Sequence, residues 1–450
     1  MYTHTALKTL SFAILTTFVQ TAFSDGVPPR YRVTELSALA GGNTRAYAIN
    51  ENGQTTGESG QGTITVGYHA FLGDPSGGIE NIETIDGYDL SEGQVINNAG
   101  QVAGTLTYFP GTTGVSTLFF YTPGAGMTHI GSLGGAYGWV EDMNDAGSVV
   151  GQWRANDGNQ HGFVYTAAEG LQDIGTFGGA YSYAYDVNNA GQIVGYAYTA
   201  NWKPRAFLWE DGAMHDLGTL GGDSSEAYAV NEAGAVVGSA KDANGVWHGF
   251  RYTAANGMEA LPLPPGATSC TPTLITEGGM IVGNCSVDSR QHGFCYTDQY
   301  GMVDMGVELG STAWTGPVAA SDAAGVLIWR MDPNTYEAFA MLYRPGLGLM
   351  DINVLLAEPL GWTIDTPVDV NAAGQLLVSG YRSNRYASAI LTPVTPGDFD
   401  VDGDVDVSDL ARLLASYGIA NGATYGQGDI DADGDVDLTD LAYLLSVYGS

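Results

Sequence analysis

The most regular feature of the chain is a series of short apolar runs, separated by turns, that recurs about every 45 residues. Residues 219–262 show one complete unit, with the four runs AYAVN, AVVGSA, HGFRYT and GMEALP. Val, Tyr and Phe favour strands, and the intervening Gly and Asn supply the positive φ angles of tight turns. Four antiparallel strands in about forty residues are typical of a β-propeller blade. The pattern therefore predicts an all-β fold.

A turn glycine marks every copy of the unit. It occurs at Gly53, Gly100, Gly147, Gly191, Gly234, Gly279, Gly325 and Gly374, at intervals of 43 to 49 residues. The residue three positions earlier is Asn50, Asn97, Asn144, Asn188, Asn231, Thr276, Asp322 or Asn371. The repeats therefore predict a propeller of about eight four-stranded blades.

The two ends of the array predict how it closes. The last unit stops after its third strand, near Pro393, whereas residues 31–42 precede the first unit as a spare fourth strand. If this strand completes the eighth blade, the ring closes and leaves no sheet edge exposed. We favour a closed ring of eight blades, with seven blades or a distorted ring as the alternative.

The segments outside the repeats predict export and a second module. Residues 1–24 combine Lys8, an apolar run and small residues at a cleavage position, which is typical of a signal peptide. We therefore expect a secreted, extracellular bacterial protein, with the propeller over 25–393, a linker at 394–397 and a small module over 398–450. Outside the signal peptide, no stretch is apolar for long enough to span a bilayer.

The charge of the chain limits its partners. Lys and Arg total 15 against 49 Asp and Glu, which gives a formal net charge of −34. A chain this acidic repels nucleic acid and anionic membranes and attracts cations. We therefore expect neither a nucleic acid nor a membrane as partner.

A duplicated acidic segment predicts two calcium sites. GDFDVDGDVDVSDL recurs 31 residues later as GDIDADGDVDLTDL, and an apolar stripe at helical spacing follows each copy. Alternating carboxylates with Gly at the sixth and an acid at the twelfth position are typical of EF-hand-type loops. The predicted ligands of the two calcium ions are Asp398, Asp400, Asp402, Asp404, Asp406 and Asp409, and Asp429, Asp431, Asp433, Asp435, Asp437 and Asp440. Asp404 and Asp435 stand where a backbone carbonyl normally coordinates.

Two family resemblances follow from these motifs. The N-x-x-G turn, the V-V-G strand, the H-G/A-F strand and the L-G-G loop resemble the HAF family of bacterial extracellular repeats, over residues 31–393. The paired acidic loops, each followed by one helix, resemble a type I dockerin over residues 397–449, which implies calcium binding and a cohesin-like protein partner. The chain departs from the dockerin partner-binding pattern, because each loop has one hydroxyl, at Ser408 or Thr439, and the basic helix pair is absent.

The three cysteines predict one disulfide. Cys270, Cys285 and Cys295 all lie in the sixth unit. Counting along the strands places Cys270 beside Cys285, and Cys285 beside Cys295, so either pair can form in an oxidising compartment. A zinc site is disfavoured because a close fourth ligand is missing.

The loops between second and third strands form the predicted ligand face. They are longer and more varied than the turns at the opposite face, and they hold most of the scarce cations of the ring. Variable loops on a rigid scaffold are common binding sites. The predicted binding residues, suited to an acidic polysaccharide, are Arg154, Trp202, Lys203, Arg205, Trp247, Arg290, Arg330, Arg382 and Arg385.

Two classes of function fit these features. His69, His161, His248 and His292 occupy one equivalent place in four units, which indicates a role in the blade, such as bonding a neighbouring backbone group. The sequence contains no nucleophile elbow, phosphate loop or zinc-binding helix. We therefore favour a secreted, non-catalytic binding or scaffold protein with a carbohydrate ligand. The alternative is a secreted glycoside hydrolase or polysaccharide lyase.

Overall fold

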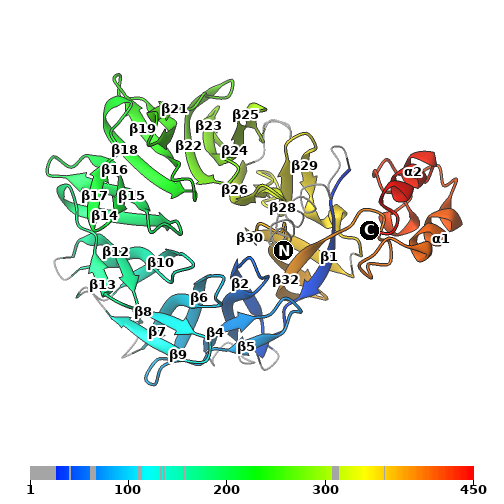
Figure 1. Cartoon of the computed structure of the whole chain (residues 1–450), viewed down its shortest axis with the longest axis horizontal. Coiled ribbons are helices and arrows are strands. Elements are labelled where there is room, and N and C mark those ends of the chain that lie inside the picture. The colour runs from blue at the N-terminus through cyan, green and yellow to red at the C-terminus, as the bar shows by residue number, and fades with distance from the viewer. Residues whose placement is uncertain are drawn as a thin grey trace, which may run out of the picture.

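The chain forms a closed ring of eight sheets with a small helical module beside it (Figure 1). The computed structural model describes residues 27–39, 42–60, 67–109, 114–131, 134, 137–155, 158–306, 314–358 and 360–450. Every sheet has four antiparallel strands, so the prediction of an all-β, eight-bladed propeller is confirmed and the seven-bladed alternative is wrong. The predicted signal peptide, residues 1–24, lies outside the described residues.

Each blade runs from an inner first strand to an outer fourth strand. The first four blades are β2 (Thr44–Ile49), β3 (Thr55–Gly60), β4 (Tyr68–Gly73) and β5 (Ile79–Asn81); β6 (Leu90–Ile96), β7 (Val102–Tyr108), β8 (Val115–Thr122) and β9 (Gly126–Gly131); β10 (Gly138–Met143), β11 (Val149–Arg154), β12 (Gln160–Thr166) and β13 (Gly170–Asp173); and β14 (Gly178–Val187), β15 (Ile193–Thr199), β16 (Pro204–Glu210) and β17 (Ala213–Asp216). The last four are β18 (Gly221–Val230), β19 (Val236–Asp242), β20 (Trp247–Thr253) and β21 (Gly257–Ala260); β22 (Ala267–Ile275), β23 (Ile281–Val287), β24 (Arg290–Thr297) and β25 (Gly301–Asp304); β26 (Trp314–Ser321), β27 (Gly325–Met331), β28 (Ala338–Arg344) and β29 (Gly348–Asp351); and β30 (Trp362–Val370), β31 (Leu376–Arg382), β32 (Arg385–Val394) and β1 (Arg30–Glu35).

The third-strand motif packs one blade against the next. Its phenylalanines are fully buried: Phe71, Phe163, Phe207, Phe250 and Phe294. The small residue before each of them gives the next blade room to approach, since a Cβ on Gly162 would lie 3.1 Å from the backbone nitrogen of Ala184 on that blade. The amide of Gly162 donates to Ser182 Oγ of the following blade at 2.9 Å. The same bond joins Ala70 to Ser91, Ala206 to Ser225 and Gly293 to Thr315.

A belt of asparagines ties the N-x-x-G turns together around the ring. Asn50 Nδ2 donates to the carbonyl of Asn97, one blade on, at 2.8 Å. The same bond leads from Asn97 to Asn144, from Asn144 to Asn188, from Asn188 to Asn231, from Asn231 to Thr276 and from Asn371 to Asn50. The repeated asparagine is therefore a link between neighbouring blades as well as a turn former.

The first strand of the chain completes the eighth blade, as predicted. β1 pairs with β32 along its whole length, from Arg30 opposite Val394 to Glu35 opposite Ala389. Tyr31, only 1% exposed, belongs to the apolar cluster shared by blades 7 and 8. The strand ends at Glu35 and is therefore shorter than the predicted segment 31–42.

The disulfide joins Cys270 and Cys285, which face each other on β22 and β23 with Cα atoms 4.0 Å apart. Cys295 is a buried free thiol. The alternative pair fails because Cys285 lies opposite His292 on β24, whereas Cys295 lies opposite Val282.

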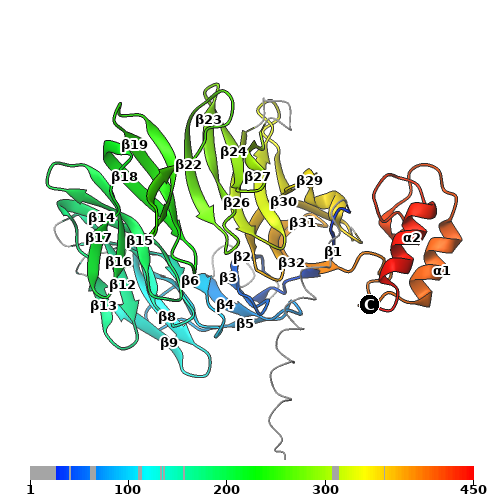
Figure 2. The ribbon, with the colours of Figure 1, turned by 45° about the horizontal axis from the view of Figure 1, so that its top comes forward.

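The C-terminal module packs against the closing strand of the ring (Figure 2). It contains helices α1 (Val407–Ser416) and α2 (Leu438–Val447) and the short 3-10 helix η4 (Tyr425–Gln427), and a further 3-10 helix, η3 (Ile352–Leu355), follows β29. Val27 and Ala357 of the ring share the apolar cluster of the module. The guanidinium of Arg30 lies 5.2 Å from the ring centre of Tyr425 and donates to the carbonyl of Val354 at 2.6 Å. Both parts of the chain therefore meet at the start of β1.

Candidate functional site

The first acidic loop gathers its carboxylates into two groups. Oxygens of Asp398, Asp400 and Asp409 lie within 4.8 Å of one another, as do oxygens of Asp404, Asp406 and Asp409. Asp409 is fully buried and belongs to both groups. The carboxylates therefore converge as the alternating pattern predicts.

The second loop repeats this arrangement. Its two groups are Asp429, Asp431 and Asp440, and Asp435, Asp437 and Asp440. Asp402 and Asp433, the two remaining predicted ligands, lie outside the groups and accept the amides of Asp404 and Asp435.

The helices hold the last acid of each loop in place. Asp406 caps α1 by accepting the amide of Ser408 at 2.6 Å, and the carboxylate of Asp409 accepts the amide of Asp406 at 2.9 Å. Asp437 and Asp440 form the same capping box on α2. The positive end of each helix dipole therefore faces the carboxylates.

Unpaired oxygens show that the loops fit a cation. One buried oxygen of each of Asp400, Asp429 and Asp435 accepts no hydrogen bond from the described residues. A buried acceptor without a donor is destabilising. Burial also raises the pKa of Asp429. Hard oxygen ligands around a sharp glycine turn, with φ of 109° at Gly403 and 90° at Gly434, suit Ca²⁺.

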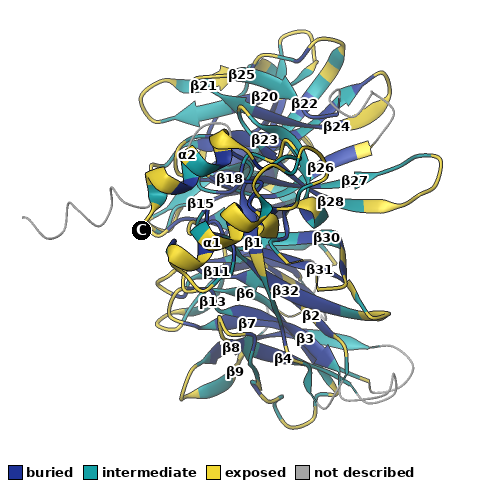
Figure 3. Ribbon diagram, turned by 90° about the vertical axis from the view of Figure 1, so that its right-hand side faces the viewer, coloured by how far each residue is buried: buried dark blue, intermediate teal, exposed yellow. Residues whose placement is uncertain are grey.

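Helices α1 and α2 both carry exposed stretches (Figure 3), and equivalent apolar residues are exposed on the two copies. Leu414 on α1 and Leu445 on α2 are related by the internal repeat and are 52% and 55% exposed. The other exposed pairs are Val407 with Leu438 and Tyr417 with Tyr448. The internal repeat therefore leaves equivalent apolar side chains of both helical segments outside the core.

The residues of the predicted ligand face lie in or beside the connections from second to third strands. Arg154, Arg330 and Arg382 end or nearly end second strands, and Trp202 and Lys203 lie in a loop. Arg205, Trp247, Arg290 and Arg385 lie at the starts of third strands.

Most of these cations are engaged by carboxylates. Lys203 Nζ lies 2.6 Å from Asp223, and Lys241 Nζ lies 3.6 Å from the same side chain. Arg205 pairs with Asp216 at 3.0 Å. Arg382 and Arg385 both hold Glu35 at the end of β1. The local positive charge of this face is therefore smaller than the sequence alone implies.

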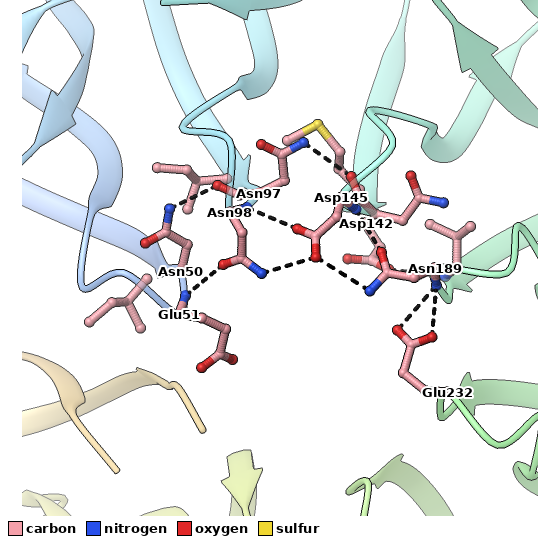
Figure 4. A pocket seen from close by; sticks show the side chains of 13 residues that line it. Asn50, Glu51, Asn97, Asn98, Asp142, Asp145, Asn189 and Glu232 are labelled. Atoms are coloured by element: carbon pink, nitrogen blue, oxygen red, sulfur yellow. Dashed lines mark hydrogen bonds between the residues drawn. The ribbon is translucent and has the colours of Figure 1, made fainter. Parts of the chain in front are cut away.

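A polar pocket lies at the opposite end of the inner strands (Figure 4). It has a volume of about 200 Å³ and is lined by turns of the first five blades. Beside the belt of asparagines, a second series of hydrogen bonds between neighbouring turns forms the rim of this pocket. The amide of Glu51 donates to Asn98 Oδ1, the amide of Asn98 to Asp145, and the amide of Asn189 to Glu232. These side chains accept the backbone amides of turns in neighbouring blades, so their first role is to link the blades.

The half-buried carboxylates of Asp142, Asp186 and Asp369 also have structural partners. Asp186 accepts the amides of Val187 and Val230, and Asp142 accepts the amide of Val187. Burial, followed by the neighbouring Asp142, raises the pKa of Asp186. Burial likewise raises the pKa of Asp369 to about 6, and this side chain accepts the amide of Ile49. Each carboxylate therefore binds backbone amides across a blade boundary.

Three of the four motif histidines bond carboxylates rather than the backbone groups that we expected, and the buried Nδ1 of His69 has no hydrogen-bond partner among the described residues. His161 Nδ1 lies 2.6 Å from Asp173, and His292 Nδ1 lies 3.0 Å from Asp304. Each aspartate ends the fourth strand of the same blade and also accepts an amide of the next turn. In blade 4, Arg205 and Asp216 take these places. The prediction that the repeated histidines serve the blade is compatible with these contacts.

Sequence reasoning missed a group of five tyrosines on two neighbouring strands of blade 4. Tyr181, Tyr183 and Tyr185 alternate along β14, and Tyr196 and Tyr198 alternate along β15. A period of two places alternate residues on one face of a sheet, so the runs YSYAY and YAY carried the signal.

Comparisons with known proteins show likeness of fold only. No protein-family model matches the chain, and no curated protein matches it. Among solved structures, TolB from Acinetobacter baumannii aligns over 64% of this chain and 65% of its own, with 13% identity and a TM-score of 0.33. A prolyl endopeptidase aligns over 82% and 57%, with 11% identity and a TM-score of 0.45. A post-proline cleaving enzyme from Rickettsia typhi aligns over 83% and 60%, with 9% identity and the same score.

These values carry no inference about activity, and the chain spans less than two thirds of each of these structures. The resemblances to HAF repeats and to a type I dockerin stay predictions. In the described part of the chain, no helix is both long and apolar enough to cross a bilayer.

Proposed function

We propose that this chain is a secreted, calcium-binding and non-catalytic binding protein, with the propeller as platform for a carbohydrate ligand. The observation that carries the proposal is the pair of acidic loops, whose buried oxygens lack hydrogen-bond donors. A module of this kind, packed against the ring through Val27 and Ala357, joins a docking element to a rigid platform.

Calcium would stabilise the module by compensating carboxylates that repel one another. Residues at both loop starts and both helix starts would hold the two ions, with Asp409 and Asp440 shared between the oxygen groups of each loop. Bound Ca²⁺ supplies positive charge and oxygen coordination to each loop. The apolar core around Leu413 and Leu444 then packs without the electrostatic cost of the empty loops.

The exposed apolar pairs on α1 and α2 favour a protein partner for the module. Leu414 with Leu445 and Tyr417 with Tyr448 offer two equivalent surfaces to one partner. A cohesin-like domain is the partner that the dockerin resemblance implies. The absence of the usual basic pair means that this docking would depend on apolar contact.

The ring offers its loop face to a saccharide. An acidic polysaccharide is the ligand that the loop cations favour, although Asp223, Asp216 and Glu35 already engage several of them. A hydrolase or lyase is less favoured, because Asp142 and Asp186 are committed to backbone amides.

Calcium titration of the full chain tests the proposal. Isothermal titration should detect two ions, and the double variant Asp409→Asn/Asp440→Asn should lose both, because each residue contributes to both oxygen groups of its loop. Asp211→Asn, in an exposed turn at φ 51°, is the matched control and should bind like the parent. Two ions retained by the double variant would contradict the assignment.

A further inference from the structure

We propose that blade 4 carries an aromatic strip that binds a neutral polysaccharide chain, and this inference rests on the binding function proposed above. The strip comprises Tyr181, Tyr183, Tyr185, Tyr196, Tyr198, Trp202 and Tyr228. It uses the inner strands β14 and β15, the loop after β15 and one residue of β18.

The rings form one continuous series. Trp202 lies 5.9 Å from Tyr181 and 6.5 Å from Tyr198, measured between ring centres. Tyr183 lies 4.7 Å from Tyr196, its partner across the strand pair. Tyr185 lies 5.5 Å from Tyr228 on the next blade. The series therefore leads from the loop face inward along blade 4 to blade 5.

The strip is not part of the core of the blades. Among the described residues, none of its members joins the buried apolar clusters of blades 4 and 5, whereas Tyr252 packs against one of them. The tyrosines are half-buried, and Trp202 is 64% exposed. Large aromatic surfaces left outside a core are typical of binding sites.

Other units carry only some members of the strip, such as Trp139 in the place of Tyr183 and Tyr381 in the place of Tyr198. In blade 5 the places of Tyr181, Tyr183 and Tyr196 are taken by polar residues: Ser224, Glu226 and Ser239. In a repeat protein, features that every unit shares support the fold, so a set that is complete in one unit alone indicates a specific function.

The chemistry of the strip suits a sugar chain. Aromatic faces pack against the C–H faces of sugar rings, while phenol hydroxyls and carboxylates bond the surrounding sugar hydroxyls. Tyr228 donates to Glu226 at 2.5 Å. Burial raises the pKa of Tyr185, and the nearby carboxylate of Glu141 on blade 3 adds to this shift.

The charge of the site selects a neutral ligand. Glu141 and Glu226 flank the strip, and the nearby Lys203 and Lys241 are both engaged by Asp223. A polyanion would therefore meet unscreened carboxylates and few available cations. Neutral sugars avoid this repulsion, and their binding should change little with salt.

Affinity electrophoresis and calorimetry with the full chain test the strip. The probes are soluble β-glucan, xylan and mannan as neutral chains, and polygalacturonate as the acidic one. At least one neutral chain should bind, and Trp202→Ala should weaken it about tenfold, the effect of one lost stacking contact. The double variant Tyr183→Leu/Tyr196→Leu, which keeps apolar bulk, should weaken binding further.

Tyr336→Ala is the matched control, because Tyr336 occupies the equivalent connection in blade 7, with φ 59° and 71% exposure. It should bind like the parent. Neutral-chain binding that survives both strip substitutions overturns the strip but leaves the proposed function intact. Binding of polygalacturonate alone, lost on Lys203→Ser, also overturns the strip and favours the loop cations. No binding to any probe overturns both.

Discussion

Replacing Tyr31 by alanine should open the ring at the single place where the chain closes on itself. Tyr31 lies on β1, is 1% exposed, and packs in the cluster that includes Leu355, Leu356 and Trp362. β1 is the only strand of its blade that is not continuous in sequence with the others. A cavity beneath this strand therefore weakens the closure directly.

The expected loss of stability is large. Truncation of a fully buried aromatic side chain to Ala costs about 3–5 kcal/mol, against a total free energy of unfolding of about 5–15 kcal/mol for a domain. Burial raises the pKa of Tyr31, so its hydroxyl stays neutral over the ordinary pH range. Tyr31→Phe keeps the packing and should cost about 1 kcal/mol or less.

Guanidinium unfolding and limited proteolysis measure the effect. Tyr31→Ala should lower the unfolding midpoint well below that of Tyr31→Phe and should make residues 27–36 the first segment cut. Met350→Ala, in the same apolar cluster but on a turn-connected strand, is the matched control and should leave residues 27–36 protected. A loss below about 1 kcal/mol for Tyr31→Ala, or unchanged protection of β1, would refute the closure argument.

Three further outcomes follow from the structure. Chelation of calcium should make residues 398–450 protease-sensitive while the ring stays folded, because the carboxylate groups lie within the module; equal resistance in excess chelator, followed by mass spectrometry, would contradict this. Burial raises the pKa of Asp369 to about 6, so the bound proton stabilises the folded chain near pH 4, and this stability is lost as pH rises through 6. Asp369→Asn should flatten this part of the plot of unfolding midpoint against pH. An unchanged slope would contradict the prediction. Burial raises the pKa of the Cys295 thiol to about 12, so a thiol reagent should label no group in the native chain. After unfolding without reductant, the reagent should label one thiol. Fast labelling of the native chain would disprove this prediction.

The architecture was predictable because the repeats encode it locally. Each N-x-x-G turn and each third-strand phenylalanine marks a blade, and the spare strand before residue 43 identifies the closure. The cysteine pair was not predictable, because strand counting tolerates errors of a few residues, and Cys285 proved to face His292 rather than Cys295.

The site was harder to predict because it depends on contacts between blades. The loop cations looked available in sequence, yet Arg382 and Arg385 reach Glu35, about 350 residues away in the chain. The tyrosines of blade 4 are alternating strand residues, and pattern alone does not tell whether such a face is covered. The acidic loops were predictable because calcium ligands follow a fixed local spacing.

The attachment of the module to β32 has a mechanical consequence. β32 is bonded to β1 on one side and to β31 on the other, and the chain leaves it at Val394 to enter the module. Tension between a ligand held by the ring and a partner held by the module would therefore pull on a strand that two hydrogen-bonded ladders hold in its sheet. Tension applied instead at Arg30 would pull on β1, an edge strand that pairs along its length with β32 alone. A tether through the module thus pulls on the strand best placed to resist it.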